Sequence, residues 1–239
     1  DSLLGSLCLR ERESATVSLI VEMAQGGVIR TRFVSMLGLS VPVMSAPMAG
    51  VSGGALAAAV AKGGGLGFIA AGHASASSEN DLASEIELYR RLTDQLKPKA
   101  PLCIGFITYS SLPRIAHVLS RYKPDVVQFT APGISADAEN IKIARQHGIS
   151  IVMAQIGSVA EAEDAVAAGV DVIIAQGTEA GGHGLRSELG TATMPLAAAV
   201  CSMVRKRSTP QDQGPLVLAA GGISDGRGLA SALSLGCDG

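Results

Sequence analysis

Short apolar runs alternate with helical patterns along most of the chain. Runs rich in Val, Ile, Leu and Ala predict strands at residues 41–46, 66–70, 102–107, 126–129, 150–155, 172–176 and 216–220. Helical patterns lie between them at residues 54–62, 82–95, 113–121, 136–146, 159–168 and 194–207, and one more follows at 226–235. Apolar runs of this kind are typical of parallel strands covered on both faces. Strands that are each followed by a helix predict a parallel sheet with right-handed crossovers.

Both a closed barrel and an open doubly wound sheet fit this order of elements. Only seven units are recognised, and the sequence stops at Gly239, just where an eighth strand is expected to start. The motifs below favour the barrel. We therefore expect an α/β fold, a TIM (β/α)8-type barrel truncated before the eighth strand. Residues 29–239 would form this C-terminally incomplete barrel domain, and residues 1–28 an N-terminal extension of unknown role.

Composition excludes several classes of protein. The formal net charge of −2 provides no basic surface for nucleic acid or anionic membrane, so neither is an expected partner. No apolar run approaches the ~18 residues of a membrane span. The cysteines at positions 8, 103, 201 and 237 have no CxxC spacing and no histidine at metal-ligand distance. We interpret them as isolated core thiols of a reducing compartment, and expect a cytoplasmic protein without a metal.

The segment LAAGGISDGRG, residues 218–228, predicts a strand that runs through Gly221 and Gly222 into a helix. Glycines at a strand end let the backbone approach a ligand, and N–H groups near a helix N-terminus favour an anion. Phosphate sites of barrels commonly form from the loops after strands seven and eight. The alternative is a tight turn with an ordinary helix N-cap at Ser224 or Asp225.

The segment IIAQGTEAGGHG, residues 173–184, leads from a buried strand ending at Gln176 to His183. Gly182 and Gly184 flank the histidine, so no bulky sequence neighbour hinders its presentation to a cleft. An imidazole titrates near neutrality, which suits proton abstraction or hydrogen bonding to a developing anion. The alternative is an ordinary surface-loop histidine.

Two further patterns compete with this interpretation. Residues 50–54 match G-x-S-x-G, which would make Ser52 the nucleophile of a hydrolase with Asp171 and His183 as its partners. A nucleophile elbow usually follows several strands, however, and here the preceding strand is the first. Residues 65–70 fit G-x-G-x-x-A, but these glycines open a strand instead of joining a strand to a helix, so we exclude a dinucleotide fingerprint.

Taken together, PVMSAPMAG, GGGLGFIAAG, AGVDVIIAQGTEAGGHG and LAAGGISDGRGLASALSLGCDG resemble the nitronate monooxygenase family, formerly called 2-nitropropane dioxygenases. The resemblance covers about residues 29 to 239, and its densest part is residues 168–184. It implies a TIM-barrel flavin oxidoreductase that binds FMN and oxidises alkyl nitronates or nitroalkanes with O2 to carbonyl compounds and nitrite. A homodimer is compatible with it.

The resemblance also implies roles for single residues. His183 matches the catalytic histidine, as base toward a nitroalkane's α-carbon or as hydrogen-bond partner of the nitronate. The positions that match cofactor contacts are Ala46, Pro47 and Met48 along the isoalloxazine ring, Gln176 and Gly181 beside the flavin, and Gly221 and Gly222 in the phosphate loop.

Two departures from the family pattern matter. Some members have an Asn on the third strand near the flavin, where this chain has Gly105. Members also continue into an eighth strand that completes the phosphate site, so we expect two unpaired sheet edges and weak or no FMN binding by the 239-residue chain. The alternatives are an FMN-dependent NAD(P)H:quinone reductase, an enoyl-acyl-carrier-protein reductase, and a truncated non-catalytic barrel.

Overall fold

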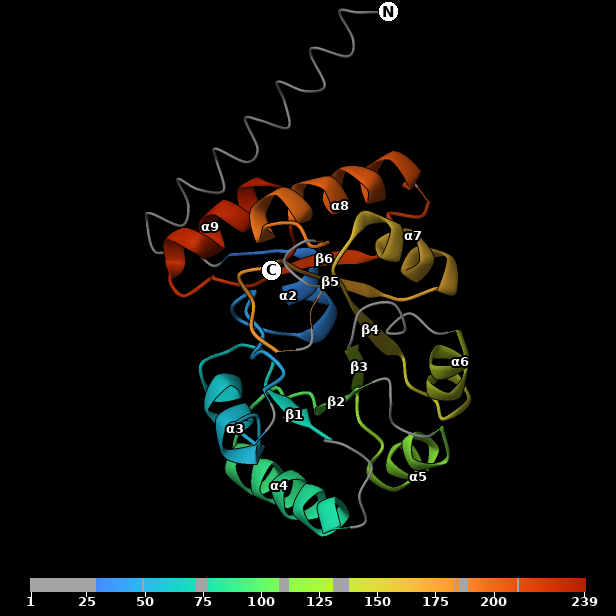
Figure 1. Cartoon of the computed structure of the whole chain (residues 1–239). Helices are drawn as coiled ribbons and strands as arrows, with labels where there is room; N and C mark the ends of the chain where they lie inside the picture. The colour runs from blue at the N-terminus through green and yellow to red at the C-terminus, as the bar shows by residue number, and fades with distance from the viewer. Residues whose placement is uncertain are drawn as a thin grey trace, which may run out of the picture.

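The structure is a computed structural model that describes residues 29–48, 50–71, 77–107, 112–130, 138–182, 184, 189–209 and 211–239. Its parallel sheet follows chain order: β1 (Phe68–Ala70), β2 (Cys103–Ile107), β3 (Val126–Thr130), β4 (Ile151–Ile156), β5 (Val172–Gln176) and β6 (Leu216–Ala220). The helices are α2 (Arg32–Leu37), α3 (Gly54–Lys62), α4 (Ser77–Thr93), α5 (Leu112–Tyr122), α6 (Ala138–Gln146), α7 (Val159–Ala168), α8 (Thr193–Arg207) and α9 (Gly226–Ser234). Helices α3 to α9 surround the strands, as expected of a (β/α) barrel (Figure 1).

The first predicted strand, residues 41–46, is reduced to a single parallel bridge with Leu66. The Leu66 N–H donates to the Val43 carbonyl over 2.9 Å, which closes the outer edge beside β1. Pro42 lies within the segment and Pro47 follows it, and each lacks the N–H that a longer ladder would need. This part of the chain therefore covers an edge without forming a regular strand.

The opposite edge, along β6, is covered by the last two residues. The Asp238 N–H donates to the Val217 carbonyl over 2.7 Å, and the Ala219 N–H donates to the Gly239 carbonyl over 3.0 Å. A Cβ built on Gly239 would lie 2.9 Å from the Pro42 carbonyl oxygen, so this end of the chain reaches the first segment. Figure 1 shows the C-terminus close to α2. The expectation of an unpaired edge is therefore wrong for β6, because Asp238 and Gly239 bond to it.

Alternate residues of the strands face two separate cores. One set fills the barrel interior: Phe68, Cys103, Val126, Met153, Val172, Ile174, Leu216 and Leu218, with Phe33 of α2. The intervening residues, such as Ile104, Val127 and Ile173, pack outward against the helices. Inward and outward layers of this kind are the packing of a TIM-type barrel, as the sequence predicts.

Three strand-joining aspartates hold the amino ends of the strands together. Each carboxylate accepts a backbone N–H bond from a neighbouring segment: Asp125 from Leu102 (2.8 Å), Asp171 from Val152 (2.6 Å) and Asp238 from Val217 (3.0 Å). Two of them also bind an arginine. Arg145 donates to Asp171 over 2.8 Å, and Arg32 donates to both carboxylate oxygens of Asp238 at 3.0 Å. These bonds tie strands to each other and α2 to the end of the chain.

Candidate active site

The loops after β5 and β6 meet at the carboxyl ends of the strands. Gly221 has φ of 121°, and a Cβ there would lie 2.6 Å from the Thr193 hydroxyl and 2.9 Å from the Ala180 nitrogen. Gly222 has φ of 68°, and its Cβ would lie 3.2 Å from the Glu179 Cβ. Both the backbone conformation and the lack of space therefore favour glycine at these positions. The two glycine motifs that the sequence singles out lie side by side.

The diglycine turn, Gly221–Gly222, offers backbone donors. In the part of the chain that the structure describes, the N–H groups of Gly222 and Ile223 donate to no acceptor. Asp225 caps α9 by accepting from the Arg227 and Gly228 N–H groups, each over 3.0 Å. The bond from the Gly228 N–H is the main reason why the pKa of Asp225 is lowered. The helix is thus capped already, and the donors before the cap are left for an anion.

The N-terminus of α8, in contrast, is already occupied by a carboxylate. Glu179 accepts from the Thr193 N–H over 2.8 Å and from the Thr193 hydroxyl over 3.0 Å. The backbone bond lowers the pKa of this exposed carboxyl below its usual value. Glu179 therefore fixes the β5–α8 loop against the start of α8, beside the diglycine turn.

A glutamine cluster, formed by Gln128, Gln155 and Gln176, faces the barrel interior near the carboxyl ends of β3, β4 and β5. The Gln155 amide donates to the Gln176 amide oxygen over 2.6 Å, and the Gln176 amide nitrogen donates to the Gly181 carbonyl over 3.3 Å. Gln128 is completely buried, and its amide donates to the Thr130 hydroxyl over 3.0 Å. Its Oε1 has no hydrogen-bond partner among the described residues. A buried acceptor without a partner costs roughly 1–3 kcal/mol, so this atom indicates a ligand or a water.

Gly105 on β2 stands where the resemblance leads us to expect an Asn in some family members. A Cβ at Gly105 would lie 2.1 Å from two ring carbons of Phe68, so the phenyl ring fills the space of any side chain there. Gly105 pairs in register with Gln128 on the next strand. A buried amide therefore stands at the same level of the barrel, displaced by one strand. Neither Gln128 nor Gln155 was predicted as a site residue from the sequence.

The predicted flavin-facing segment, Ala46 to Met48, is held in place by Ser52. The Ser52 hydroxyl donates to the Ala46 carbonyl over 2.7 Å and accepts from the Met48 N–H over 3.0 Å. Ser52 is buried, and its own carbonyl accepts from the Ala70 N–H over 2.9 Å. This serine shapes the loop that follows the first segment and anchors it to the end of β1.

These contacts contradict the hydrolase interpretation. The Ser52 hydroxyl is engaged by backbone, and Asp171 lies at the amino end of β5, bound to Arg145 and Val152. The histidine motif follows the carboxyl end of the same five-residue strand. At ~3.3 Å per residue, Asp171 lies about 16 Å from the carboxyl end of β5, where Gly184 contacts Gln176, so the described contacts of Ser52 and Asp171 are not those of a triad.

His183 itself lies outside the described residues, although both its neighbours are described. The Gly184 N–H donates to the Gly182 carbonyl over 3.1 Å. A Cβ on Gly184 would lie 3.2 Å from the Gln176 amide oxygen. The chain on both sides of position 183 therefore lies at the carboxyl end of β5, next to the glutamine cluster.

No group of three or more His, Cys, Asp and Glu side chains among the described residues could hold a metal ion. None of the helices described there has the length and apolar character needed to cross a membrane.

Known proteins that resemble this chain indicate its family. The sequence model of the nitronate monooxygenase family matches residues 30–99 and 97–239. The chain belongs to the nitronate monooxygenase family. A nitronate monooxygenase of Neurospora crassa is 34% identical over 220 residues, which cover 82% of this chain and 57% of that protein.

Two solved structures are also similar to this member of the family. FabK from Thermotoga maritima aligns with a TM-score of 0.71 and 31% identity, over 87% of this chain and 60% of that one. A nitroalkane oxidase from Streptomyces ansochromogenes aligns with a TM-score of 0.65 and 29% identity, over 86% and 65%. The chain spans about three fifths of the length of the curated relatives it matches, for example 57% and 62%. The family and barrel fold predicted from the motifs are confirmed.

Proposed function

We propose that this chain forms the FMN-binding barrel of a flavin oxidoreductase that oxidises alkyl nitronates or nitroalkanes with O2 to carbonyl compounds and nitrite. The observation that carries the proposal is the diglycine turn, whose Gly222 and Ile223 N–H groups have no acceptor among the described residues. The diglycine turn shares one rim with the glutamine cluster. In that cluster the Gln128 Oε1 is buried and has no hydrogen-bond partner among the described residues. Membership of the nitronate monooxygenase family supports the reaction.

The residues present fit the parts of FMN. The N–H groups at the diglycine turn would hold the phosphate, and the backbone of Ala46, Pro47 and Met48 would lie along the ring system. Gln128 and Gln176 would supply amide contacts to the ring, with Gly181 beside them. When bound, FMN supplies the electron transfer between the nitronate and O2.

The substrate would enter over an apolar part of the same rim. Met48 is 39% exposed, Val51 60% and Leu189 73%, and all three stand on loops that lead from the carboxyl ends of the barrel segments. Exposed apolar side chains of this size suit the alkyl part of a nitro compound. His183 would take the proton from the α-carbon of a neutral nitroalkane, or donate a hydrogen bond to a nitronate.

A flavin titration tests the phosphate cradle. We expect the purified chain to bind FMN at least about tenfold more tightly than riboflavin, because only FMN carries the phosphate that the N–H groups would hold. Quenching of flavin fluorescence measures both affinities. Equal affinity for the two flavins would contradict the assigned cradle. The same titration decides the prediction that FMN binds weakly.

Substitution of His183 tests the catalytic role. His183→Asn is expected to lower turnover of a neutral nitroalkane by at least about 100-fold, because that substrate must lose a proton. Turnover of the pre-formed nitronate should fall far less. Oxygen uptake with each substrate provides the comparison, and His147→Asn, at the end of α6, is the matched control. Equal losses on both substrates would exclude proton abstraction by His183.

A second candidate function is an FMN-dependent NAD(P)H:quinone reductase or enoyl-acyl-carrier-protein reductase. The structural likeness to FabK supports this candidate. Anaerobic reduction of the flavin by nitronate, and separately by NADH, distinguishes the two. Reduction by neither would favour a non-catalytic barrel. A cytoplasmic location and a homodimer remain predictions.

A further inference from the structure

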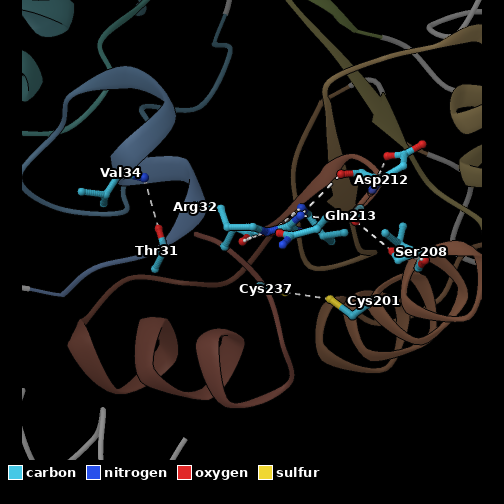
Figure 2. A network of polar contacts seen from close by, with 12 residues as sticks. Thr31, Arg32, Val34, Cys201, Ser208, Asp212, Gln213 and Cys237 are labelled. Carbon is cyan, nitrogen blue, oxygen red and sulfur yellow. Dashed lines mark hydrogen bonds and ion pairs between the residues drawn. The ribbon is translucent and has the colours of Figure 1, made fainter. Parts of the chain in front are cut away.

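A cavity of about 570 Å³ lies at the amino end of the barrel, far from the candidate active site. It is bordered by the end of α8, the start of β6 and Arg32 of α2, and Cys201 forms part of its wall. Figure 2 shows Arg32, Gln213 and Ser208 near Cys201, with Cys237 opposite. The proposed function uses none of these residues.

Cys201 and Cys237 face each other in this region, one on α8 and the other after α9 (Figure 2). Their sulfur atoms are 3.7 Å apart, and both residues are buried, at 4% and 6% exposure. The expectation of isolated thiols is wrong for this pair, because the fold joins positions that are distant in the sequence. A disulfide needs the sulfurs at about 2 Å, so the two sulfur atoms must approach each other by a further ~1.7 Å.

An arginine lies close to Cys201. A Cβ on Gly236 would lie 2.7 Å from an Arg205 nitrogen and 3.7 Å from the Cys201 Cβ, so this glycine lets the guanidinium approach. The hydrogen bond with Cys237 is the main reason why the pKa of Cys201 is lowered, and Arg205 and Arg32 make the smallest contributions in the same direction. Burial and the charge of Asp238 oppose this shift. The pKa of Cys237 is raised, chiefly by its hydrogen bond with Cys201. Geometry distinguishes the two thiols as well, since Cys201 lines the cavity and Cys237 is not among the lining residues.

We propose that Cys201 and Cys237 are a peroxide-reactive dithiol that closes to a disulfide, with Cys201 as the attacking thiol. The cavity provides the path by which a small peroxide reaches Cys201. Peroxides oxidise the thiolate form of cysteine where they can reach it, and the cavity wall provides that access to the otherwise buried Cys201. A lone buried thiol would lack both the cavity and the resolving partner.

The reaction balances with hydrogen peroxide as the oxidant. The Cys201 thiolate attacks one peroxide oxygen, so an S–O bond forms, the O–O bond breaks, and the departing hydroxide takes a proton to become water. Cys237 then gives up its proton, and its sulfur attacks the Cys201 sulfur. An S–S bond forms as the S–O bond breaks, and the second oxygen leaves as water. The two thiols are oxidised to a disulfide and one peroxide is reduced to two waters.

The disulfide would join α8 to the segment that follows α9. Helices α8 and α9 come directly before and after β6 in the chain. Because α9 follows the diglycine turn, the bond would restrict the element that begins at the candidate phosphate cradle. The link closes a long loop, so it should raise the thermal midpoint of unfolding.

Peptide mapping tests the proposal in a Cys8→Ser background. The folded protein is treated with hydrogen peroxide, remaining thiols are alkylated, and peptides are mapped by mass spectrometry. We expect one link between positions 201 and 237, a mass lower by two hydrogen atoms, and reversal by dithiothreitol. The midpoint of thermal unfolding should rise by roughly 5–10 °C.

Single variants separate the two roles. In Cys237→Ser, dimedone should label Cys201 as a trapped sulfenic acid, and Cys201→Ser should lose both the label and the link. Cys103→Ser is the matched control, because Cys103 is buried in the barrel interior and burial raises its pKa. This variant should keep the 201–237 link.

Three results would overturn the proposal. They are labelling of Cys237 in preference to Cys201, oxidation of Cys201 to sulfonic acid without a link, and a link that forms as fast in urea-unfolded protein. Each is measurable on the protein that retains both thiols, so the test stands even if a serine variant fails to fold. None of the readouts requires flavin, so failure here leaves the proposed FMN chemistry untouched.

Discussion

The two ends of the barrel use polar groups in opposite ways. At the amino end, the three strand-joining aspartates accept backbone N–H bonds, and Asp171 and Asp238 also bind an arginine. At the carboxyl end, Gly222 and Ile223 donate to no acceptor in the described chain, and the Gln128 Oε1 is buried without a partner there. One end therefore satisfies its polar groups within the chain, whereas the other presents groups that a ligand would satisfy.

This difference separates stability from binding. In TIM barrels the amino-end face contributes to stability and the carboxyl-end loops carry the sites. Substitutions that are far apart and share no partner have independent effects. We therefore expect amino-end changes to alter the free energy of unfolding without altering FMN affinity, and carboxyl-end changes to alter FMN affinity.

The largest loss of stability is expected from Asp238→Ala. The Asp238 side chain is 10% exposed, accepts from Val217, and binds Arg32 at both oxygens. Its removal leaves the buried Val217 N–H without an acceptor and takes the carboxylate from the Arg32 guanidinium, which keeps only its bonds to the Gln213 and Gly214 carbonyls. We expect the free energy of unfolding to fall by about 3 kcal/mol. Urea denaturation measures this loss, and Asp164→Ala on the exposed face of α7 is the control. A changed FMN affinity in Asp238→Ala would break the proposed separation of the two ends.

Gly221→Ala should affect both properties. Its φ of 121° disfavours a side chain, and the new Cβ would meet Thr193 and Ala180. We expect the free energy of unfolding to fall by about 2 kcal/mol, with a clear loss of FMN affinity. Gly148→Ala is the matched control at the amino end, because Gly148 has φ of 77° and nothing within 4 Å of its Cβ position. If both variants bind FMN equally well, the diglycine turn is not the phosphate cradle.

Gln128→Leu is expected to change the two properties in opposite directions. The substitution removes a buried acceptor that has no partner among the described residues, so the ligand-free chain should gain about 1 kcal/mol of unfolding free energy. The same change should weaken FMN binding, because the ligand loses an amide contact. Denaturation without flavin and a fluorescence titration with it measure the two effects. Gln146→Leu, exposed at the end of α6, should change neither. A destabilised Gln128→Leu would show that water already satisfies the amide.

The sequence predicted the regular elements well because their signals are local. The strands from β1 to β6 and the helices from α3 to α9 lie at or near their predicted bounds, except that α4 begins at Ser77 where a start at Leu82 was predicted. Helix α2 was missed, although Thr31 caps its start and Gly38 ends it, because six residues are too few to show a helical period. The strand predicted at residues 41–46 failed because its prolines remove donors that apolar content does not reveal.

The site was predicted only in part, because direction and distance within the fold are not local properties. The structure brings Gln176, Gly181 and the diglycine turn to one rim, while their role as cofactor contacts remains a prediction. Gln128 and Gln155 were overlooked as single polar residues in apolar strands. The available signal was a single polar residue that interrupts an apolar strand near its end, as Gln176 does. Nothing in the sequence indicates that Cys201 and Cys237 meet.

The smallest effect concerns pH at the carboxyl end, where Glu179 caps α8. Hydrogen bonds from Thr193 lower its pKa in the folded protein, so the carboxylate's contribution to stability is complete above its ordinary pKa of 4.5. That contribution is lost as the pH falls through the lowered value, because protonation removes the charged acceptor. Glu179→Gln does not titrate, so its deficit in unfolding free energy against the wild type should be constant near neutral pH and shrink below pH 4.5. Denaturation of both proteins across this range checks the sign, and a deficit that grows in acid would mean that Glu179 is not the cap of α8.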